Sequence, residues 1–470
     1  MTIIRCVFTN NTGYAAAIEN YGGPTNCEFC GTLILIDSDV VSNTAPSGNI
    51  IGAIVNQSTG TGNGIVNAKM TIRDSRIIGN SAGGFGAILN FDGSLVMSNT
   101  VVVGNSATDD IDGALGNRIS GILTNKSAGA MELTSCLFSN NYARRGAGAI
   151  YNAGNPSKIL NCVFVNNANS GGDGGAVYSG SGSLLVSNCS FVANRAIGHG
   201  AGIANGGQLD IFNSTFSGNL CDLSGSAIMN AGVVTLTSST VSSNYAISGP
   251  SGGIRSDGVL FVTNCTITLN GGAIVGYGIA LLRNSIIAGN GTDIGVTSVS
   301  EGFNLIGNGD GSGLTNGVNN DQVGTAAVPL DPKLGPLQDN GGSTWTHALR
   351  FDSPAIDAGH SSGLTTDQRG FPRPIDDPAT PNASGGDGSD IGAYEADPHL
   401  RLTAIARSGN DILLNFPTVF GRSYQIDGKN NLSGSWTMVT NNIPGSGGIM
   451  QAVETGGANQ PRRFYRAAQQ

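Results

Sequence analysis

A pattern of three positions recurs eleven times in the first 290 residues, and it constrains the fold more than any other feature of the chain. It consists of a Ser, Cys or Thr that we call the anchor, an apolar residue two positions later and an asparagine five positions later. The anchors are residues 6, 38, 75, 100, 136, 162, 189, 214, 239, 265 and 285. Matches at both following positions in all eleven units indicate a repeat architecture in which each unit stacks on the next.

The spacing of the anchors suggests the shape of each unit. From Cys136 to Cys265 the anchors lie 26, 27, 25, 25 and 26 residues apart, the length of one three-sided turn of strands. Earlier spacings reach 37 residues, which predicts loops inserted into a constant coil. Alternating apolar residues before the anchor, such as Leu184 and Val186, predict a strand with one inward face. We therefore expect an all-β chain whose right-handed parallel β-helix has about eleven coils and a length on the order of 50 Å.

The repeat also predicts how each coil turns and what its interior holds. The residue before the anchor is Asn in six coils and Asp or Ser in four more, and these types tolerate the left-handed conformation of a sharp corner. Gly-Ala-Ile-like clusters, as at residues 148–150, provide a third element where backbones approach closely. The asparagine after the anchor is expected to face inward and form an amide ladder. These asparagines are Asn11, Asn43, Asn80, Asn105, Asn141, Asn167, Asn194, Asn219, Asn244, Asn270 and Asn290.

Five coils carry the sequence Phe-x-x-Asn, and most coils carry a Gly-Ala-Ile variant. This pairing resembles the repeats of polymorphic outer-membrane adhesins and related bacterial β-helix proteins, over roughly residues 2–300. The resemblance implies a protein of the bacterial surface.

Residues 303–398 interrupt the repeat and contain four polar motifs, at 339–344, 353–359, 366–373 and 390–395. In this order the motifs resemble the choice-of-anchor Q module, which follows β-helices in secreted bacterial proteins. The resemblance implies extracellular or surface placement. In physical terms, we expect this segment to cap the open end of the helix, whose strand edges and apolar core need a cover.

Residues 399–470 form a third unit, with alternating runs at 411–416, 423–426 and 436–439 that predict strands. Several short strands with turn signals indicate a small antiparallel β-sandwich-like domain. The predicted organisation is thus 1–302 for the β-helix, 303–398 for the cap and 399–470 for this domain. Trp345 and Trp436 are expected to be core residues rather than sugar-stacking platforms.

No cofactor-binding or metal-binding residues are predicted. The four histidines, at 199, 347, 360 and 399, lack metal-ligand spacing. The anchor cysteines, among them Cys136, Cys162 and Cys189, are expected to be buried free thiols. Cys27 and Cys30 form half of a zinc or redox motif, so a local disulfide or no role is expected. In the cap, a polar set could line a binding site, but buried Arg–Asp pairing is the simpler expectation. This set consists of Asp357, His360, Asp367, Arg369 and Asp390.

The main alternative function is that of a polysaccharide lyase or glycoside hydrolase, because such sites need carboxylates close together on an outer face. Asp37 and Asp74 share the position before the anchor, and Asp109, Asp110 and Asp112 form a separate acidic cluster. Because Asn takes the same corner position in six other coils, a turn role explains Asp37 and Asp74. We therefore predict no catalytic residue.

Composition and charge narrow the possible partners. The net charge is −9 with only 12% charged residues, and no basic stripe suggests a nucleic-acid partner. No apolar run approaches the roughly 18 residues that span a membrane. Because Met1 leads directly into the first repeat, we expect a truncated sequence that has lost its export signal. The expected function is a secreted or surface-associated bacterial scaffold that contacts polysaccharide or cell-surface ligands without catalysis.

Overall fold

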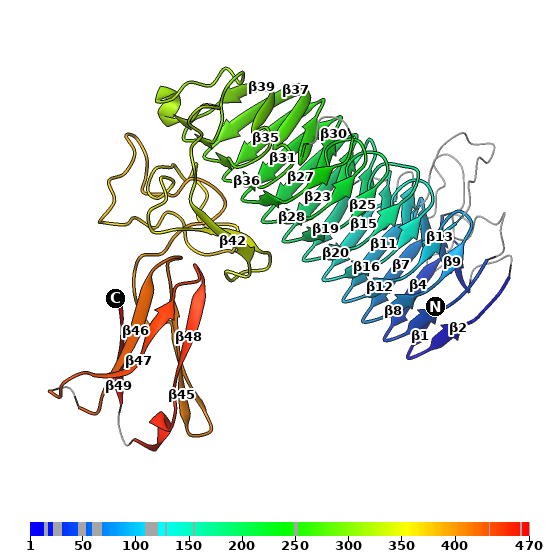
Figure 1. Cartoon of the computed structure of the whole chain (residues 1–470). Coiled ribbons are helices and arrows are strands. Elements are labelled where there is room, and N and C mark those ends of the chain that lie inside the picture. Colours follow the sequence, from blue (N-terminus) through cyan, green and yellow to red (C-terminus); the bar gives the residue numbers. More distant parts are fainter. Residues whose placement is uncertain are drawn as a thin grey trace.

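The computed structural model describes residues 1–13, 17–21, 31–45, 53–58, 68–108, 121–126, 129–153, 156–248, 252–431, 433–460 and 463–469. A long rod of stacked coils leads into an irregular segment and then into a small β-domain (Figure 1). Strands of successive coils pair in parallel and in register along the rod, so the predicted parallel β-helix is confirmed.

One coil in the middle of the rod shows the plan of the others. It consists of β26 (Ile203–Asn205), β27 (Gln208–Phe212), β28 (Thr215–Ser217) and β29 (Leu220–Cys221). The equivalents of β26 and β27 form two ladders of one 21-stranded sheet, which we call sheet A. Those of β28 form the 13-stranded sheet B, and those of β29 form the seven-stranded sheet C. Each coil therefore has three sides, as its length predicted.

The strands of each ladder follow in chain order. The first ladder of sheet A contains β3 (Ile18–Tyr21), β6 (Ile54–Gln57), β10 (Ile88–Phe91), β14 (Leu123–Lys126), β18 (Ile150–Asn152), β22 (Val177–Ser179), β26, β30 (Ile228–Asn230) and β34 (Ile254–Ser256). The second contains β1 (Thr2–Ile4), β4 (Thr32–Ile36), β7 (Lys69–Arg73), β11 (Ser94–Ser98), β15 (Met131–Thr134), β19 (Ser157–Leu160), β23 (Ser183–Ser187), β27, β31 (Val233–Thr237) and β35 (Val259–Thr263). The two ladders merge in β37 (Ile274–Arg283) and β39 (Ile294–Ser300).

Sheets B and C consist of shorter strands. Sheet B contains β2 (Val7–Thr9), β5 (Asp39–Val41), β8 (Arg76–Ile78), β12 (Val101–Val103), β16 (Leu137–Ser139), β20 (Val163–Val165), β24 (Ser190–Val192), β28, β32 (Thr240–Ser242), β36 (Thr266–Thr268), β38 (Ile286–Ile287), β40 (Leu305–Ile306) and β41 (Gln322–Val323). Sheet C contains β9 (Ser81–Ala82), β13 (Ser106–Ala107), β17 (Tyr142–Ala143), β21 (Ala168–Asn169), β25 (Arg195–Ala196), β29 and β33 (Tyr245–Ala246).

Two left-handed corners flank the sheet B strand of every repeat coil. The residue before the anchor has a positive φ in all eleven coils, from 44° at Ser238 to 55° at Asn188. The residue four positions after the anchor is also left-handed in all eleven, from 53° at Asn140 to 72° at Gly289. The predicted corner is confirmed. It explains why Asn, Asp and Ser, which adopt this conformation at low cost, recur there.

The predicted amide ladder is also confirmed. Asn194 donates from Nδ2 to Asn219 Oδ1 and to the carbonyl of Phe164, each at 3.0 Å, and the same amide oxygen accepts the backbone N–H of Asn194. The row ends at Asn290, whose Nδ2 donates to Asp293 Oδ1 at 2.9 Å. A carboxylate suits this end because it accepts without needing a further acceptor of its own. Burial raises the pKa of this Asp293 carboxyl.

A second row of hydrogen-bonded asparagine side chains runs near the ends of the first-ladder strands of sheet A. The sequence pattern did not predict this second amide ladder. Its rungs include Asn90 and Asn125, with Nδ2 to Oδ1 distances of 2.6 Å on both sides of Asn90. The row is interrupted at Ser179, which lies between Asn152 and Asn205 in the pairing register. The members of this row are Asn20, Asn56, Asn90, Asn125, Asn152, Ser179, Asn205 and Asn230.

Aromatic rings and thiols fill the core at the repeat positions. Phe138, Phe164, Phe191 and Phe216 stack with centroid separations of 5.0, 4.7 and 4.6 Å. The anchor cysteines from Cys136 onward are buried free thiols, as expected, whereas the anchor Cys6 is exposed. Cys27 and Cys30 lie outside the described residues.

The parallel pairing continues past residue 302, where the β-helix was expected to end. β40 and β41 extend sheet B by two strands. In these coils Asn304 and Asp321 take the anchor position, and Asn304 donates its backbone N–H to Asp321 Oδ1 at 2.9 Å. The repeat pattern did not predict these two coils, because neither Asn304 nor Asp321 is a Ser, Cys or Thr. Leu314 and Val323 pack against the last part of the rod core.

The rest of the cap lies along the side of the rod. The 3₁₀ turn Val318–Asn320 still belongs to the last coil of the rod, before β41, and the rest of the cap begins with the antiparallel pair β42 (Leu334–Gln338) and β43 (Thr346–Leu349). Gln368 bridges two rungs of sheet B, donating to Thr215 Oγ1 at 2.9 Å and accepting from Thr240 Oγ1 at 2.7 Å. The expectation that residues 303–398 cover the open end therefore holds only for the first part, because later residues bind the hydroxyls of sheet B instead.

Buried ion pairs hold the cap together. Arg369 pairs with Asp367 at 2.7 Å, and Arg373 pairs with Glu395 at 2.7 Å, with side chains at most 3% exposed. The expected Arg–Asp pairing is confirmed. His360 lies apart from these pairs and contacts the ring of Phe303, with centroids 5.6 Å apart.

The C-terminal domain consists of two three-stranded antiparallel sheets. One contains β44 (Ala404–Ser408), β45 (Asp411–Pro417) and β48 (Ile449–Glu454), and the other contains β46 (Ser423–Lys429), β47 (Thr437–Pro444) and β49 (Phe464–Gln469). A short 3₁₀ turn, Gly457–Asn459, precedes β49. Phe416 and Tyr424 pack in the core between the sheets. The expected small β-domain is confirmed.

The expectation that both tryptophans are core residues is wrong. Trp345 is 56% exposed, because it lies at the tip of the β42–β43 hairpin. Trp436 is half-buried at the domain surface, where Lys429 Nζ and Arg466 Cζ lie 4.4 and 4.7 Å from its ring centre.

Candidate functional site

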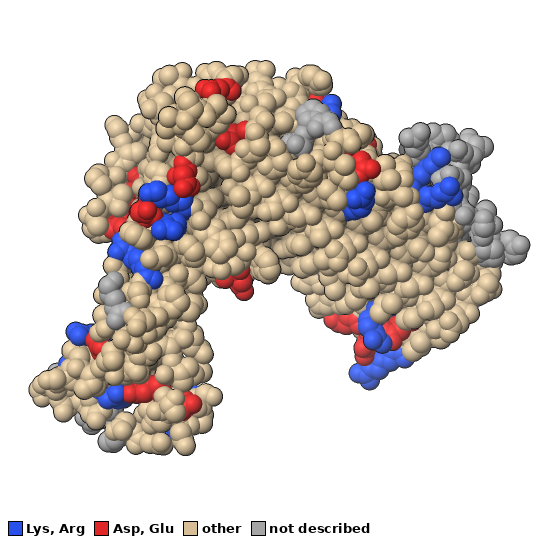
Figure 2. All heavy atoms as spheres, viewed as in Figure 1, with Lys and Arg blue, Asp and Glu red and all other residues tan. Residues whose placement is uncertain are grey.

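The rod and the C-terminal domain enclose a hollow on the sheet B side of the molecule (Figure 2). We call this hollow the notch. Its walls are the uncovered strands β12 to β24 of sheet B and the outer face of the β44–β45–β48 sheet. Trp345 lies at the covered end of the first wall.

The first wall is an uncharged aliphatic sheet face. The outer positions of β12, β16, β20 and β24 are Val101, Val103, Leu137, Ser139, Val163, Val165, Ser190 and Val192. Water-facing positions of a sheet are usually polar, as in sheet A, where Lys69, Arg73 and Glu132 point outward. Val163 is exposed, Ser139 is buried and the other six are partly exposed, so this wall is a partly exposed, mostly aliphatic face, which is typical of an interaction surface.

The second wall has the same character. Leu414, Phe416 and Ala452 face the domain core, so the alternate residues of β44, β45 and β48 face outward. Figure 1 shows β45 and β48 on the side of the domain that faces the hollow. Apart from Asp411, at the start of β45, these outer residues are uncharged: Ala404, Ala406, Ser408, Leu413, Asn415, Pro417, Ile449, Gln451 and Val453. Two apolar walls therefore face one space.

The β42–β43 hairpin joins the first wall to the covered part of sheet B. The backbone carbonyl of Trp345 accepts a hydrogen bond from Thr215 Oγ1 at 2.6 Å, and Thr344 Oγ1 donates to the carbonyl of Asn213 at 3.0 Å. These bonds hold the hairpin tip on β28 while the indole stays 56% exposed.

A cavity of about 170 Å³ lies at the junction of the cap with the second wall. Phe371, Ile375 and Ile449 form much of its apolar lining, and the ion pair of Arg401 with Asp397, at 2.8 Å, lies at its side. Beside the second wall there is thus a small recess of mixed lining, in which Arg369, Asp397 and Arg401 accompany the apolar side chains.

Specific bonds fix the angle between the cap and the C-terminal domain. The hydroxyl of Tyr394 donates to the carbonyl of Gly447, and Arg369 Nη1 donates to the same carbonyl at 3.3 Å. Gln338 Nε2 donates to the carbonyl of Ser446 at 2.7 Å. Because these groups already hold the walls in place, a partner would not have to order them on binding.

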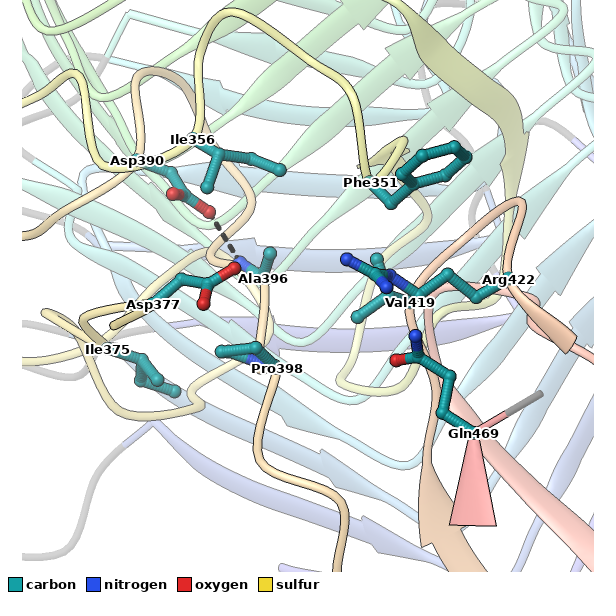
Figure 3. Close-up of a pocket in the computed structure, with 10 residues that line it drawn as sticks. All are labelled: Phe351, Ile356, Ile375, Asp377, Asp390, Ala396, Pro398, Val419, Arg422 and Gln469. Carbon is teal, nitrogen blue, oxygen red and sulfur yellow. Dashed lines mark hydrogen bonds between the residues drawn. The ribbon is translucent and has the colours of Figure 1, made fainter. Parts of the chain in front are cut away.

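A second pocket at this junction is too small for a ligand. Figure 3 shows Asp377 and Asp390 from the cap on one side and Arg422 from the domain on the other. Its volume of about 20 Å³ corresponds to roughly one water molecule. Asp390 is buried and accepts the backbone N–H of Ala396 at 2.6 Å, and burial raises its pKa well above the ordinary value. The pocket is part of the structural joint.

The polar residues considered as catalytic candidates have structural partners. Asp37 is left-handed at its corner and pairs with Arg5 at 3.1 Å, while Asp74, at the same corner, accepts from Asn99 Nδ2 at 3.1 Å. Asp109, Asp110 and Asp112 lie outside the described residues. His347 is buried, with Nε2 2.9 Å from Ser242 Oγ.

Metal clusters and membrane-spanning helices were both considered for the described part of the chain. It contains no cluster of three His, Cys, Asp or Glu side chains suited to a metal ion. No helix there has the length and apolar character needed to span a membrane.

In comparisons with known proteins, no family model matches the chain and no curated protein matches it. Only the geometry of the described residues therefore points to a binding site. The sequence pattern did not predict the notch, although one signal was present. The residues one and three positions after the anchor are uncharged in eight consecutive coils, from Val101 to Ala288, and in the first four of these coils they are mostly aliphatic.

Proposed function

We propose that this protein is a non-catalytic adhesion scaffold that holds a partner in the notch by contact of apolar surfaces. The observation that carries the proposal is the pair of largely uncharged walls facing one hollow. A secreted or cell-surface location is part of the proposal. It is supported by the likeness of the coils to adhesin repeats and of residues 303–398 to the choice-of-anchor Q module.

The chemistry of the walls favours a partner that presents apolar surface. Burial of aliphatic side chains supplies a favourable free energy of about 25 cal/mol per Å². A charged partner would lose hydration against the walls without gaining an ion pair. An exposed tryptophan, such as Trp345, is one of the residue types that contribute most to binding.

The test is a pelleting assay with fluorescent protein on intact bacterial cells and on insoluble cellulose, chitin and collagen. Val163→Lys places a charge on the first wall, and Trp345→Ala removes the exposed ring. Each is expected to reduce the bound fraction about tenfold, since either change removes the equivalent of one central contact. Val96→Lys is the matched control, because Val96 and Val163 are both 41% exposed but Val96 lies on sheet A.

Three outcomes would count against the proposal. Equal loss in Val96→Lys and Val163→Lys would show that binding does not use the notch, and absence of binding to every surface would remove the adhesion function. New reducing ends or unsaturated sugars from pectin, alginate or neutral glycans, lost in Asp37→Ala or Asp74→Ala, would establish the enzyme instead.

A further inference from the structure

A second surface of different chemistry lies on sheet C. Each sheet C strand has two residues, of which the first faces outward and the second faces the core. Over five consecutive coils the outward residues stack in register as Tyr142, Ala168, Arg195, Leu220 and Tyr245. We call this column the tyrosine track. Sheet C forms a different side of each coil from sheet B, so the track does not border the notch.

The two tyrosines at the ends of the track expose their rings. Tyr142 is 39% exposed and Tyr245 is 55% exposed. The hydroxyl of Tyr142 is 2.6 Å from Ser170 Oγ, one coil further along the rod. The ring therefore extends along the rod axis, beside the small side chain of Ala168. Exposed aromatic rings that lie along a surface offer flat apolar platforms.

Polar groups lie between the two platforms and beside them. Arg195 Nη2 pairs with Asp222 Oδ1 at 3.1 Å, and both side chains are partly exposed. His199, in the turn that follows, has Nδ1 3.2 Å from the carbonyl of Ser224. Because a carbonyl only accepts, Nδ1 carries the hydrogen, and Nε2 of the neutral ring is an acceptor. The track thus combines apolar platforms with donors and acceptors held by the fold.

This combination matches a sugar chain. A pyranose ring presents an apolar C–H face that stacks on an aromatic ring and hydroxyl groups that bond to guanidinium and carboxylate groups. Adjacent coils are about 4.8 Å apart, a distance comparable to one sugar unit of an extended chain. The two tyrosines are four coil steps apart, or about 19 Å, so a chain of four to five units would reach from one platform to the other.

We propose that the tyrosine track binds a linear, uncharged oligosaccharide that lies along the rod axis, with one sugar unit to each coil. Tyr142 and Tyr245 stack on the two end units, and Arg195 with Asp222 bonds to the hydroxyls of the central one. Asp173 and Asp222 lie in the turns that follow β21 and β29. Their carboxylates would repel the charges of an acidic sugar chain, so such a chain is a poor match. This site does not depend on the partner of the notch.

The experiment is calorimetric titration of the whole chain with 1,4-linked gluco-, manno- and xylo-oligosaccharides of two to seven units. Affinity for the preferred series is expected to rise with length until both tyrosines are reached, at four to five units, and then to level off. Tyr245→Ala should weaken binding of the long oligosaccharides about tenfold and move the plateau to shorter chains. Arg195→Met should weaken binding of chains of three units or more, which reach the central coil from either tyrosine.

Tyr277→Ala is the matched control, since Tyr277 is 90% exposed but lies on β37 of sheet A. This variant and Trp345→Ala are expected to bind oligosaccharides as the parent does. Thermal melts verify that all variants are folded. Failure of every oligosaccharide to bind, affinity independent of length, or equal losses in Tyr245→Ala and Tyr277→Ala would overturn the assignment. If Trp345→Ala abolished oligosaccharide binding, the sugar site would lie in the notch instead.

Discussion

Replacing Ser179 by asparagine should stabilise the rod, because Ser179 interrupts the second amide ladder. On either side of it in register lie Asn152 and Asn205, so the coil geometry already accommodates an asparagine in both neighbours. With serine present, Asn152 Nδ2 and Ser179 Oγ are buried without a hydrogen-bond partner. The residues themselves are fully buried.

The size of the effect follows from these two atoms. An unsatisfied buried donor or acceptor costs about 1–3 kcal/mol. In Ser179→Asn the new Oδ1 would accept from Asn152 Nδ2, and the new Nδ2 would donate to Asn205 Oδ1, completing the row as at Asn90. Allowing for the extra volume of the side chain, we expect a net gain of about 1–3 kcal/mol in the free energy of unfolding.

Urea unfolding followed by circular dichroism measures this gain as a higher midpoint with an unchanged slope. Ser179→Ala is the control, because it removes the unpaired hydroxyl but leaves the Asn152 amide unpaired, so its midpoint should rise less than that of Ser179→Asn. Asn205→Ser should lower the midpoint, since it opens a gap beside the existing one. A lower midpoint in Ser179→Asn together with no change in Asn205→Ser would refute the reasoning.

Two further predictions concern the first ladder and the cap. Asn194→Ala removes the acceptor of Asn167 Nδ2 and the donor to the Phe164 carbonyl. It should lower the free energy of unfolding by about 1–3 kcal/mol in the same urea assay. An unchanged midpoint would mean that the asparagine row is solvated. Burial, with the nearby Asp376 and Asp377, raises the pKa of the Asp357 carboxyl from 3.8 to about 7 in the folded protein. The folded state therefore binds this proton more tightly than the unfolded chain. The contribution is fully present below pH 3.8 and is lost as the pH rises through 7. Melting temperatures from pH 4 to pH 8 should show this loss in the parent and a smaller loss in Asp357→Asn, and parallel curves for the two proteins would exclude Asp357 as its source.

The coil could be predicted from the sequence because its constraints are local and repeated. A left-handed corner selects the same few residue types in every coil, and a buried amide row tolerates only a side chain that both donates and accepts. Asn188 and Asn194 show these two constraints within one coil. The second ladder escaped notice because loops of varying length separate its asparagines from the anchors. The last two coils escaped notice because Asn304 and Asp321 meet the anchor requirement with a different side chain.

The candidate site could not be predicted in the same way, because it depends on which outer positions the rest of the chain covers. Thr215 and Val163 both follow an anchor by one residue, so the repeat alone makes them equivalent. They differ because Thr215 bonds to Trp345, which is 130 residues further along, whereas Val163 stays 41% exposed. The structure links this position to the cap: where the cap covers sheet B, the residue after the anchor is a threonine in three coils (Thr215, Thr240 and Thr266) and an isoleucine, Ile286, in the fourth, whereas in the open wall it is aliphatic in three coils of four. An outer side chain that makes no hydrogen bond within the protein is free to be selected for contact with a partner. This is the physical reason for assigning binding to the open coils.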